Sequence, residues 1–317
     1  MKTGDEVLNE SQTFLKIPLL ERFSMTRTPI GRFLEIPEEF RSPASRFRIL
    51  PIPYEGTVCF ERGTAEGPRR ILAVSDQMEY LDEETFCEFY RPGILTLPAI
   101  EPEETPEAEM EAIRRAVLED RLFEDGFFPM ILGGEHSVTA PVVRVAAEKY
   151  PDLSVLQFDA HSDLRDAFPP GGKNSHASVM RRVLEVVPTI VQVGIRSFSE
   201  EDPVHCPQQV KNFITPIMVE EDFSGALETI LTRLTDHVYV TIDMYAFDPS
   251  IAPGVGTPEP GGLTWRQITR ILRAVFREKR VVGADVVETA PLPGSVVTEF
   301  LAARLVAKIM TYDTRSH

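Results

Sequence analysis

Short apolar runs rich in Val, Ile and Leu recur along the chain and alternate with stretches in which apolar positions repeat at helical spacing. Such runs indicate buried strands, and the helical spacing indicates amphipathic helices. The runs predict strands at 47–52, 94–97, 128–132, 153–158, 190–195, 238–242 and 281–287. The stretches between them predict helices at 65–78, 106–124, 138–149, 178–186, 223–234, 264–277 and 295–310.

Strands that are each followed by a helix indicate βαβ units and a buried parallel sheet, so the fold class is α/β. About eight strands fit one doubly wound domain, and a closed eight-fold barrel has the same count and stays as the alternative. Both place functional sites at the carboxyl ends of the strands. Residues 1–45 show no clear periodicity and are interpreted as an arm or lid before a single domain at 46–317.

Charge and composition narrow the functional classes. The chain has 317 residues, with 33 Lys and Arg against 49 Asp and Glu, and a net charge of −16. An acidic balance argues against nucleic acid or an anionic membrane as the main partner. No apolar run has the roughly 20 residues that a membrane-spanning helix needs. The polar N-terminus and three cysteines without a CxxC motif favour a reduced, cytoplasmic protein.

Polar side chains gather where three predicted strands end. Gly133–Ser137 (GGEHS) follows the strand at 128–132, Asp159–Asp163 (DAHSD) follows 153–158, and Asp243 ends 238–242. In extended chain, Asp159, His161 and Asp163 would share one face. Two carboxylates and an imidazole suit Mn²⁺, Zn²⁺ or Ni²⁺ better than Ca²⁺. Three such clusters at strand ends predict a metal site.

These motifs resemble those of the ureohydrolase family, which includes arginase and agmatinase. The hallmarks are the GGEHS and DAHSD segments and the TIDMYAFDP segment at 241–249. Further matches are Tyr54–Thr57, the SHASVMRR segment at 175–182, the PGGLT segment at 260–264, and Asp285–Glu288. The resemblance runs from about residue 46 to the end. The His176 and Asp285–Glu288 segments resemble agmatinase more than arginase.

The resemblance implies a three-layer α/β/α sandwich around a parallel, roughly eight-stranded sheet, shared distantly with the histone deacetylases. It implies two Mn²⁺ ions bridging a hydroxide that attacks a guanidinium carbon and releases urea. His136, Asp159, Asp163 and Asp243 match ligands of one ion, and Asp159, His161 and Asp243 match ligands of the other. His176 matches a proton-shuttling histidine, and Glu288 matches a carboxylate that holds the guanidinium. A homo-oligomer, trimer or hexamer, is also implied.

Position 245 departs from the family pattern, which has Asp two residues after Asp243. Here the residue is Tyr245, a neutral phenol on a longer stem with a reference pKa of about 10. It would replace a ligand of the second ion only. Three outcomes follow: one tight and one weak ion, two ions with Tyr245 or added water as ligand, or an empty second position.

Agmatinase-like hydrolysis of a small cationic guanidino compound, agmatine to putrescine and urea, is the leading hypothesis. The rivals are a non-catalytic member of the family that binds or regulates, and a one-metal hydrolase of another C–N substrate. Tyr245 motivates the first rival. The deacetylase relatives motivate the second, since they carry out such chemistry on a related fold.

Overall fold

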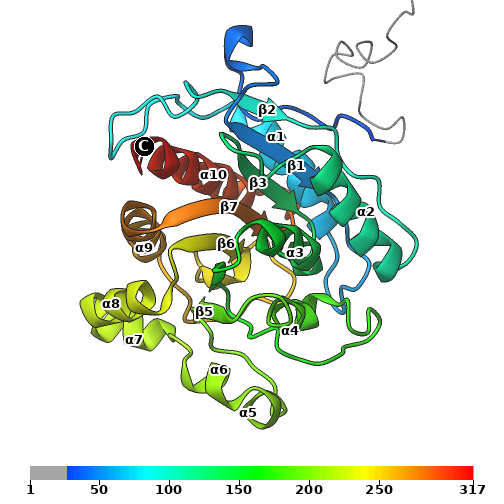
Figure 1. The fold of residues 1–317 in the computed structure, drawn as a ribbon, viewed down its shortest axis with the longest axis vertical. Coiled ribbons are helices and arrows are strands. Elements are labelled where there is room, and N and C mark those ends of the chain that lie inside the picture. Colours follow the sequence, from blue (N-terminus) through cyan, green and yellow to red (C-terminus); the bar gives the residue numbers. More distant parts are fainter. Residues whose placement is uncertain (1–26, 317) are drawn as a thin grey trace, which may run out of the picture.

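The computed structural model describes residues 27–316 (Figure 1). Seven strands within this range form one sheet: β1 (Phe47–Ile52), β2 (Ile94–Thr96), β3 (Phe128–Gly133), β4 (Ser154–Phe158), β5 (Thr189–Val193), β6 (His237–Asp243) and β7 (Arg280–Val287). All neighbouring strands are parallel, in the order β2-β1-β3-β7-β6-β4-β5. The sheet is open, with β2 and β5 at its edges. The barrel alternative is therefore wrong.

The described range contains ten α-helices. They are α1 (Gly67–Ser75), α2 (Pro106–Glu119), α3 (Thr139–Lys149), α4 (Val179–Val183), α5 (Asp202–His205), α6 (Pro207–Lys211), α7 (Pro216–Glu221), α8 (Phe223–Arg233), α9 (Trp265–Glu278) and α10 (Val297–Ser316). Helices α1, α9 and α10 pack together, as do α2, α3 and α4. Figure 1 shows the sheet between these two groups.

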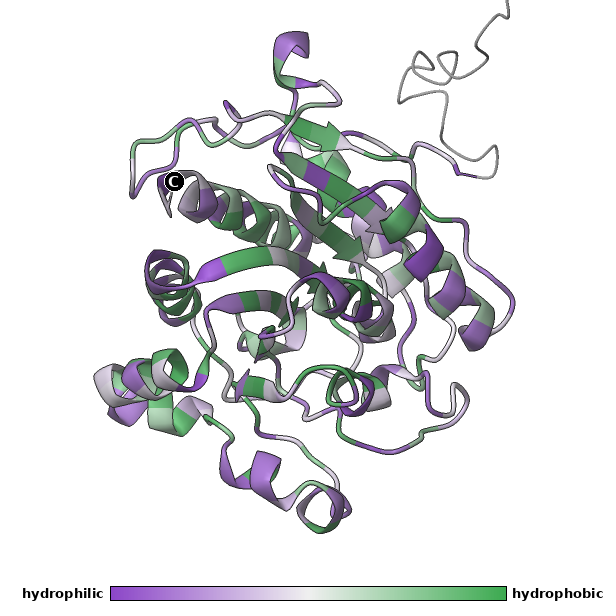
Figure 2. Ribbon diagram, in the orientation of Figure 1, coloured by the Kyte–Doolittle hydropathy of each residue, from purple (hydrophilic) through white to green (hydrophobic). Residues whose placement is uncertain are grey.

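The core is split by the sheet into two apolar clusters. Alternate residues of one strand enter different clusters: Met130 and Leu132 belong to one, and Ile131 to the other. This is the period of two expected of a strand that is buried on both faces. Figure 2 shows the strands mainly in green and much purple on the outlying helices. The predicted three-layer α/β/α sandwich is confirmed.

The predicted strand count of about eight differs from the observed seven. Beyond edge strand β5, residue Ile214 forms only an isolated parallel bridge with Val193. Gln192 and Gly194 exchange backbone hydrogen bonds with Ile214 at this point. The place of an eighth strand is thus occupied by a single bridged residue, because α7 begins at Pro216, two residues later.

The helices at 202–221 were not predicted from the sequence. Each of α5, α6 and α7 carries a proline at its first or second position, which favours helix initiation but leaves too few residues for a periodic pattern. The last helix was predicted to end at 310, but it runs to Ser316. No helix among residues 27–316 is long and apolar enough to cross a bilayer.

The predicted arm at 1–45 is described only from Arg27 onward. Thr28 forms an antiparallel bridge with Ala99, beyond edge strand β2, and Phe33 and Leu34 are fully buried in the core. Backbone N–H groups of Phe33 and Leu34 donate to the hydroxyls of Thr96 and Ser75. Residues 27–45 thus cover this edge of the sheet. None of them lines the cavity described below.

Candidate metal centre and active site

Four loops at the carboxyl ends of the strands carry the predicted site residues. His136 follows β3, Glu288 follows β7, Asp243 ends β6, and Asp159–Asp163 follows β4. These four strands are consecutive neighbours in the sheet, in that order. Because all four strands are parallel, their carboxyl ends lie on the same side of the sheet, where ligands bind in open α/β folds. The loops open on a cavity of about 320 Å³.

The GGEHS turn brings the backbone of two loops very close. A side chain at Gly134 would place its Cβ 1.9 Å from the carbonyl oxygen of Tyr54, so only glycine fits there. The Gly134 N–H donates to Ile52, and its carbonyl accepts from the Glu288 N–H at 2.8 Å. This contact joins the loops after β1, β3 and β7 and fixes His136 at the start of the next turn.

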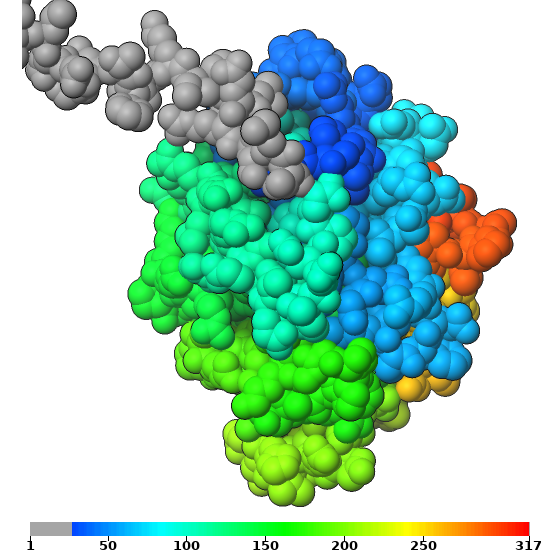
Figure 3. All heavy atoms as spheres, turned by 90° about the vertical axis from the view of Figure 1, so that its right-hand side faces the viewer, coloured from blue at the N-terminus to red at the C-terminus, as the bar shows by residue number. Residues whose placement is uncertain are grey.

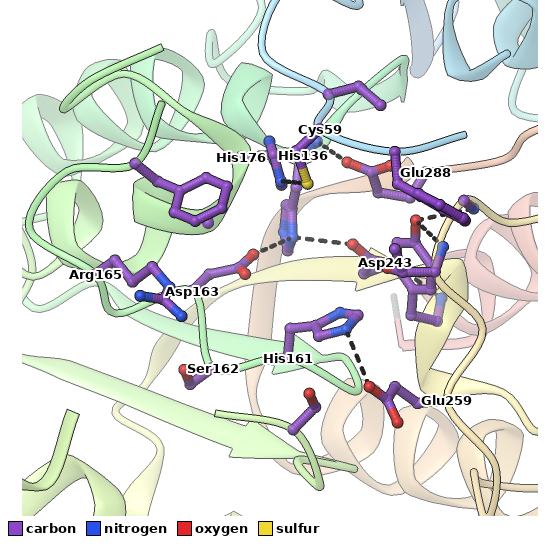
Figure 4. Close-up of a pocket in the computed structure, with 18 of the residues that line it drawn as sticks. Cys59, His136, His161, Ser162, Asp163, Arg165, His176, Asp243, Glu259 and Glu288 are labelled. Carbon is purple, nitrogen blue, oxygen red and sulfur yellow. Dashed lines mark hydrogen bonds and ion pairs between the residues drawn. The ribbon is translucent and has the colours of Figure 1, made fainter. Parts of the chain in front are cut away.

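His136 lies at the centre of the candidate metal centre. Its Nδ1 is 3.2 Å from Asp159 Oδ2, 3.1 Å from Asp163 Oδ2 and 3.2 Å from Asp243 Oδ2. Its Nε2 lies 2.8 Å from the hydroxyl of Thr241, which fixes the ring. All four donor side chains are buried. Figure 4 shows Asp163 and Asp243 approaching the ring from opposite sides.

This donor set fits a divalent transition-metal ion. Among the described residues, Nδ1 of His136 is buried and has no hydrogen-bond partner of acceptable geometry. Two donor atoms that bind one ion at right angles, each roughly 2.1 Å from it, lie roughly 3 Å apart. The spacing around Nδ1 is of that size. His136, Asp159 and Asp163 also have donor atoms that all lie within 4.8 Å of one another.

The ionisable side chains of the site also favour a bound cation. Burial and the negative charge of Asp159 raise the pKa of Asp243 to about 8. Burial opposes a charged imidazole at His136, but its three carboxylate neighbours outweigh burial and raise its pKa well above the usual value. His161, although burial also opposes its charge, has its pKa raised to about 9 by Asp159. The cluster therefore favours an added positive charge.

His161 lies on the side of the cluster where a second ion is predicted. Its Nδ1 is 3.6 Å from Asp159 Oδ1, and its Nε2 is 4.0 Å from Glu259 Oε1 (Figure 4). Its backbone N–H donates to Asp159 Oδ1 at 2.8 Å. The chain is not extended through Asp163, whose φ is +53°. The three side chains of the D-x-H-x-D segment therefore come together through a turn, and not through the extended chain that was expected.

The second metal position does not fit in the same way, because of Tyr245. Its hydroxyl oxygen accepts hydrogen bonds from the backbone N–H groups of Gly256 at 2.9 Å and Thr257 at 3.0 Å. Its ring meets the His161 ring edge-on, with centroids 5.0 Å apart. Burial, Glu288 and Asp243 raise the pKa of Tyr245 well above its usual value. The phenol is therefore neutral, and its oxygen binds the loop at 256–257.

Glu288 and His176 line the same cavity as the metal cluster. Glu288 is buried, with φ of +61°, and its Oε1 accepts from the His136 N–H at 2.7 Å. Burial and the charge of Asp243 raise the pKa of Glu288 well above its usual value. The His176 ring lies beside Cys59, with Nε2 3.9 Å from Sγ (Figure 4).

The structure thus brings the predicted site residues together. His136, His161, Asp163, His176, Asp243 and Glu288 line the cavity, and Asp159 lies behind them against His136 and His161. Two residues to which the sequence analysis gave no role, Thr57 and Glu135, connect to His176. Thr57 lies within Tyr54–Thr57, one of the segments that resemble the family, so the sequence already marked this position. Figure 3 shows the blue segment around residue 60 against the green one around 170.

Comparison with known proteins agrees with the fold and the motifs. The model of the arginase family matches residues 45–312. The N(1)-aminopropylagmatine ureohydrolase of Synechocystis is 38% identical over 83% of this chain and 88% of its own length. The agmatinase of Bacillus subtilis is 35% identical over 77% and 83%. The crystal structure of the agmatine ureohydrolase of Thermoplasma volcanium is 28% identical, with a TM-score of 0.76 over 94% and 97%.

The fold and the site define a protein of the ureohydrolase class. The chain belongs to the arginase family, and the predicted membership is confirmed. This membership confirms the prediction that the protein is a hydrolase acting on C–N bonds.

Proposed function

We propose that the protein hydrolyses a small cationic guanidino compound, agmatine or its aminopropyl derivative, to urea and an amine. One observation carries the proposal. The cavity that holds the His136 cluster is also lined by Glu288 and His176. Donors for a metal, a carboxylate for a guanidinium and a histidine for a leaving amine are thus within one cavity. The names of the relatives from Synechocystis and Bacillus subtilis support the two substrates.

The residues that would hold the metal are His136, Asp159, Asp163 and Asp243, and we propose Mn²⁺ as the ion. Bound there, a divalent ion lowers the pKa of water and so supplies a nucleophile at neutral pH. The carboxylates of this set are buried, and Asp159 raises the pKa of Asp243, so a bound cation would offset their mutual repulsion. His161, Asp159 and Asp243 remain as donors for a second, weaker ion.

We propose that Glu288 binds the guanidinium. One of its oxygens accepts a hydrogen bond from the His136 N–H, which holds the carboxylate beside the metal cluster at the cavity wall. A carboxylate can accept paired N–H bonds from a planar guanidinium. Burial disfavours the charge of Glu288 when the cavity is empty, and a cationic substrate restores it. Its pKa thus falls as substrate binds.

We propose that His176 protonates the leaving amine. Hydrolysis adds one water to the guanidinium carbon and breaks the bond from that carbon to the alkyl-bearing nitrogen. This nitrogen leaves as an amine and needs a proton, which an imidazole can supply near neutral pH. The aromatic wall at Phe168 meets the His176 ring edge-on at 5.9 Å and restricts its motion.

The outer cavity suits an alkyl chain that ends in a cation. Phe60, Phe168 and Phe198 provide apolar wall, and Glu61 and Glu259 provide carboxylates. Arg165 is the one Lys or Arg side chain among the described residues of the lining. An amine-terminated substrate matches this balance better than an amino acid, whose carboxylate would need more basic side chains. Agmatine and its aminopropyl derivative both end in amines.

The experiment is urea release by Mn²⁺-loaded protein from three substrates: agmatine, N1-aminopropylagmatine and arginine. We expect urea from one or both of the first two, with kcat/KM for arginine lower by at least about a hundredfold, since a wrongly charged group would have to be buried unpaired. Glu288→Gln should abolish release. Equal turnover of arginine would contradict the proposed substrate class, and no urea from any of them would contradict the reaction.

One observation favours a second candidate. The Tyr245 hydroxyl is committed to backbone N–H groups, which leaves the second ion without a ligand at that position. A hydrolase that works with the single His136-bound ion on another C–N substrate, or a member that binds guanidino ligands without turnover, would have this site. Binding of agmatine without urea release would favour the non-catalytic member.

A further inference from the structure

Thr57 lies between a buried carboxylate and the histidine proposed to protonate the leaving amine. Its hydroxyl oxygen Oγ1 is 2.5 Å from Glu135 Oε1, 3.0 Å from the backbone nitrogen of His176 and 3.1 Å from Nδ1 of the same ring. Thr57 and Glu135 are both fully buried. The loops after β1 and β3 and the turn at His176 thus meet at one hydroxyl group.

The donors and acceptors around Thr57 and Glu135 follow from their chemistry. The Glu135 carboxylate receives the Thr57 N–H at 2.6 Å, the Thr57 hydroxyl at 2.5 Å and the Ser137 hydroxyl at 2.5 Å. Thr57 therefore uses its only hydroxyl proton on Glu135. A hydroxyl oxygen has two remaining lone pairs and no further proton. One lone pair accepts from the His176 backbone N–H.

The remaining lone pair of Thr57 faces Nδ1 of His176, so Nδ1 must be the donor in this contact. A neutral imidazole with a proton on Nδ1 has an unprotonated Nε2. Nε2 is the nitrogen beside Cys59, 3.9 Å from Sγ, and both residues line the cavity. The nitrogen that faces the cavity is therefore the one that can gain and lose a proton.

We propose that Glu135 and Thr57 are positioning residues that hold His176 as the Nδ1–H tautomer, with Nε2 directed at the leaving nitrogen of the substrate. The inference rests on the proposed function for its catalytic meaning, but the tautomer itself does not need a substrate. In the cation, Nε2–H gives its proton to the leaving nitrogen as the C–N bond breaks. The ring then returns to the neutral Nδ1–H form that Thr57 stabilises.

The test combines the tautomer with turnover. Long-range ¹⁵N–¹H NMR of protein labelled at histidine, loaded with diamagnetic Zn²⁺, distinguishes the two ring nitrogens, and His176→Asn assigns the signal. We expect Nδ1–H in the wild type. Thr57→Val keeps the shape and the backbone N–H but accepts no hydrogen bond, so His176 should shift toward the Nε2–H form.

For the Mn²⁺-loaded protein we expect Thr57→Val to lower kcat for urea release by about tenfold or more, with KM little changed, since a positioned acid contributes roughly a hundredfold or more. Thr57→Ser should restore both tautomer and kcat. Thr311→Val is the matched control, because Thr311 is equally buried and its hydroxyl donates only to Ala307 within its own helix. It should change neither readout.

The wild type in the Nε2–H form, or an unchanged tautomer in Thr57→Val, would overturn the inference. Nδ1–H in the wild type, lost in Thr57→Val and regained in Thr57→Ser, supports it even if no urea is released. In that case only the proposed function fails, because the tautomer is measured without substrate.

Discussion

Tyr245 shows how one side chain changes a donor set. Its ring occupies the side of the cluster next to His161, and its hydroxyl accepts from Gly256 and Thr257. The sequence predicted that a ligand is replaced, but it could not predict where the hydroxyl points. That direction depends on the backbone of the loop at 256–257, which the residue pattern around position 245 does not describe.

We therefore expect Tyr245→Asp to restore a carboxylate beside Asp243 and to raise the affinity for a second ion, together with any urea-forming activity. The measurement is metal content per chain by elemental analysis after Mn²⁺ loading, with urea assayed on the same sample. Tyr245→Phe is the matched control. It should lose about 1–3 kcal/mol of unfolding free energy without gaining metal, since the buried N–H of Gly256 and the part-buried N–H of Thr257 lose their acceptor. Equal metal content in the two variants would contradict this interpretation of Tyr245.

The buried carboxyl of Glu109 should make the stability of the protein depend on pH. It is fully buried in the first turn of α2, and its Oε2 accepts from the Glu103 N–H while Oε1 has no partner among the described residues. Burial raises its pKa to about 7 from a usual 4.5. A carboxyl whose folded pKa is raised contributes stability below its unfolded pKa, and that contribution is lost as the pH rises from about 4.5 to 7.

Glu109→Gln keeps the shape and an acceptor for the Glu103 N–H but carries no charge. We expect it to be more stable than the wild type above pH 7, by up to about 3 kcal/mol, with the difference shrinking toward pH 4.5. Urea denaturation at pH 5 and pH 8 measures this. A difference that is the same at both pH values would show that the charge of Glu109 is not its cause.

At the scale of elements, the strands were predicted well because their apolar runs are buried on both faces of the sheet. The predicted strand 238–242 is β6, which extends it by one residue at each end. The helices α5, α6 and α7 could not be predicted from periodicity, since none exceeds six residues. Among the longer helices, the one predicted at 264–277 is α9, and Thr264, the first residue of the predicted range, is its N-cap.

The α9 cap yields a prediction at this scale. Thr264 accepts from the Gln267 N–H at 3.2 Å, and the Gln267 side chain accepts from the Thr264 N–H at 2.8 Å, which completes a capping box. Thr264→Ala should lower the unfolding free energy by about 1 kcal/mol, and Thr264→Ser should retain most of it. Chemical denaturation gives both values. A serine variant as unstable as the alanine variant would argue against capping as the cause.

At the scale of the whole molecule, strand order decides where the chemistry lies. The sequence predicted polar clusters at strand ends, and the parallel sheet places them at one edge. It did not predict that β3, β7, β6 and β4 are consecutive neighbours, which brings His136, Glu288, Asp243 and Asp159 together. Such pairings join residues that are distant in the sequence, such as Met130 with Ala284 and Leu156 with Val240, and local pattern carries no information about them. The link from Thr57 to Glu135 was missed for the same reason.

The proposed oligomer, the cytoplasmic location and the role of the N-terminal arm remain predictions from the sequence. The arm meets the body at Arg27, whose guanidinium donates to Asp120 and to the carbonyl of Pro98. Beyond that point, residues 1–26 lie outside the described chain, so the interpretation of the arm as a lid is not tested. Among the described residues of the arm, 27–45, none lines the cavity.

The most direct measurement is metal content per chain together with urea release from agmatine, for wild type and His136→Asn after Mn²⁺ loading and removal of free ion. We expect one tightly held ion per wild-type chain, urea release in proportion to the bound ion, and loss of both in His136→Asn. Undiminished metal content in His136→Asn would contradict the assignment of the centre. A loaded wild type that releases no urea would contradict the hydrolysis of agmatine.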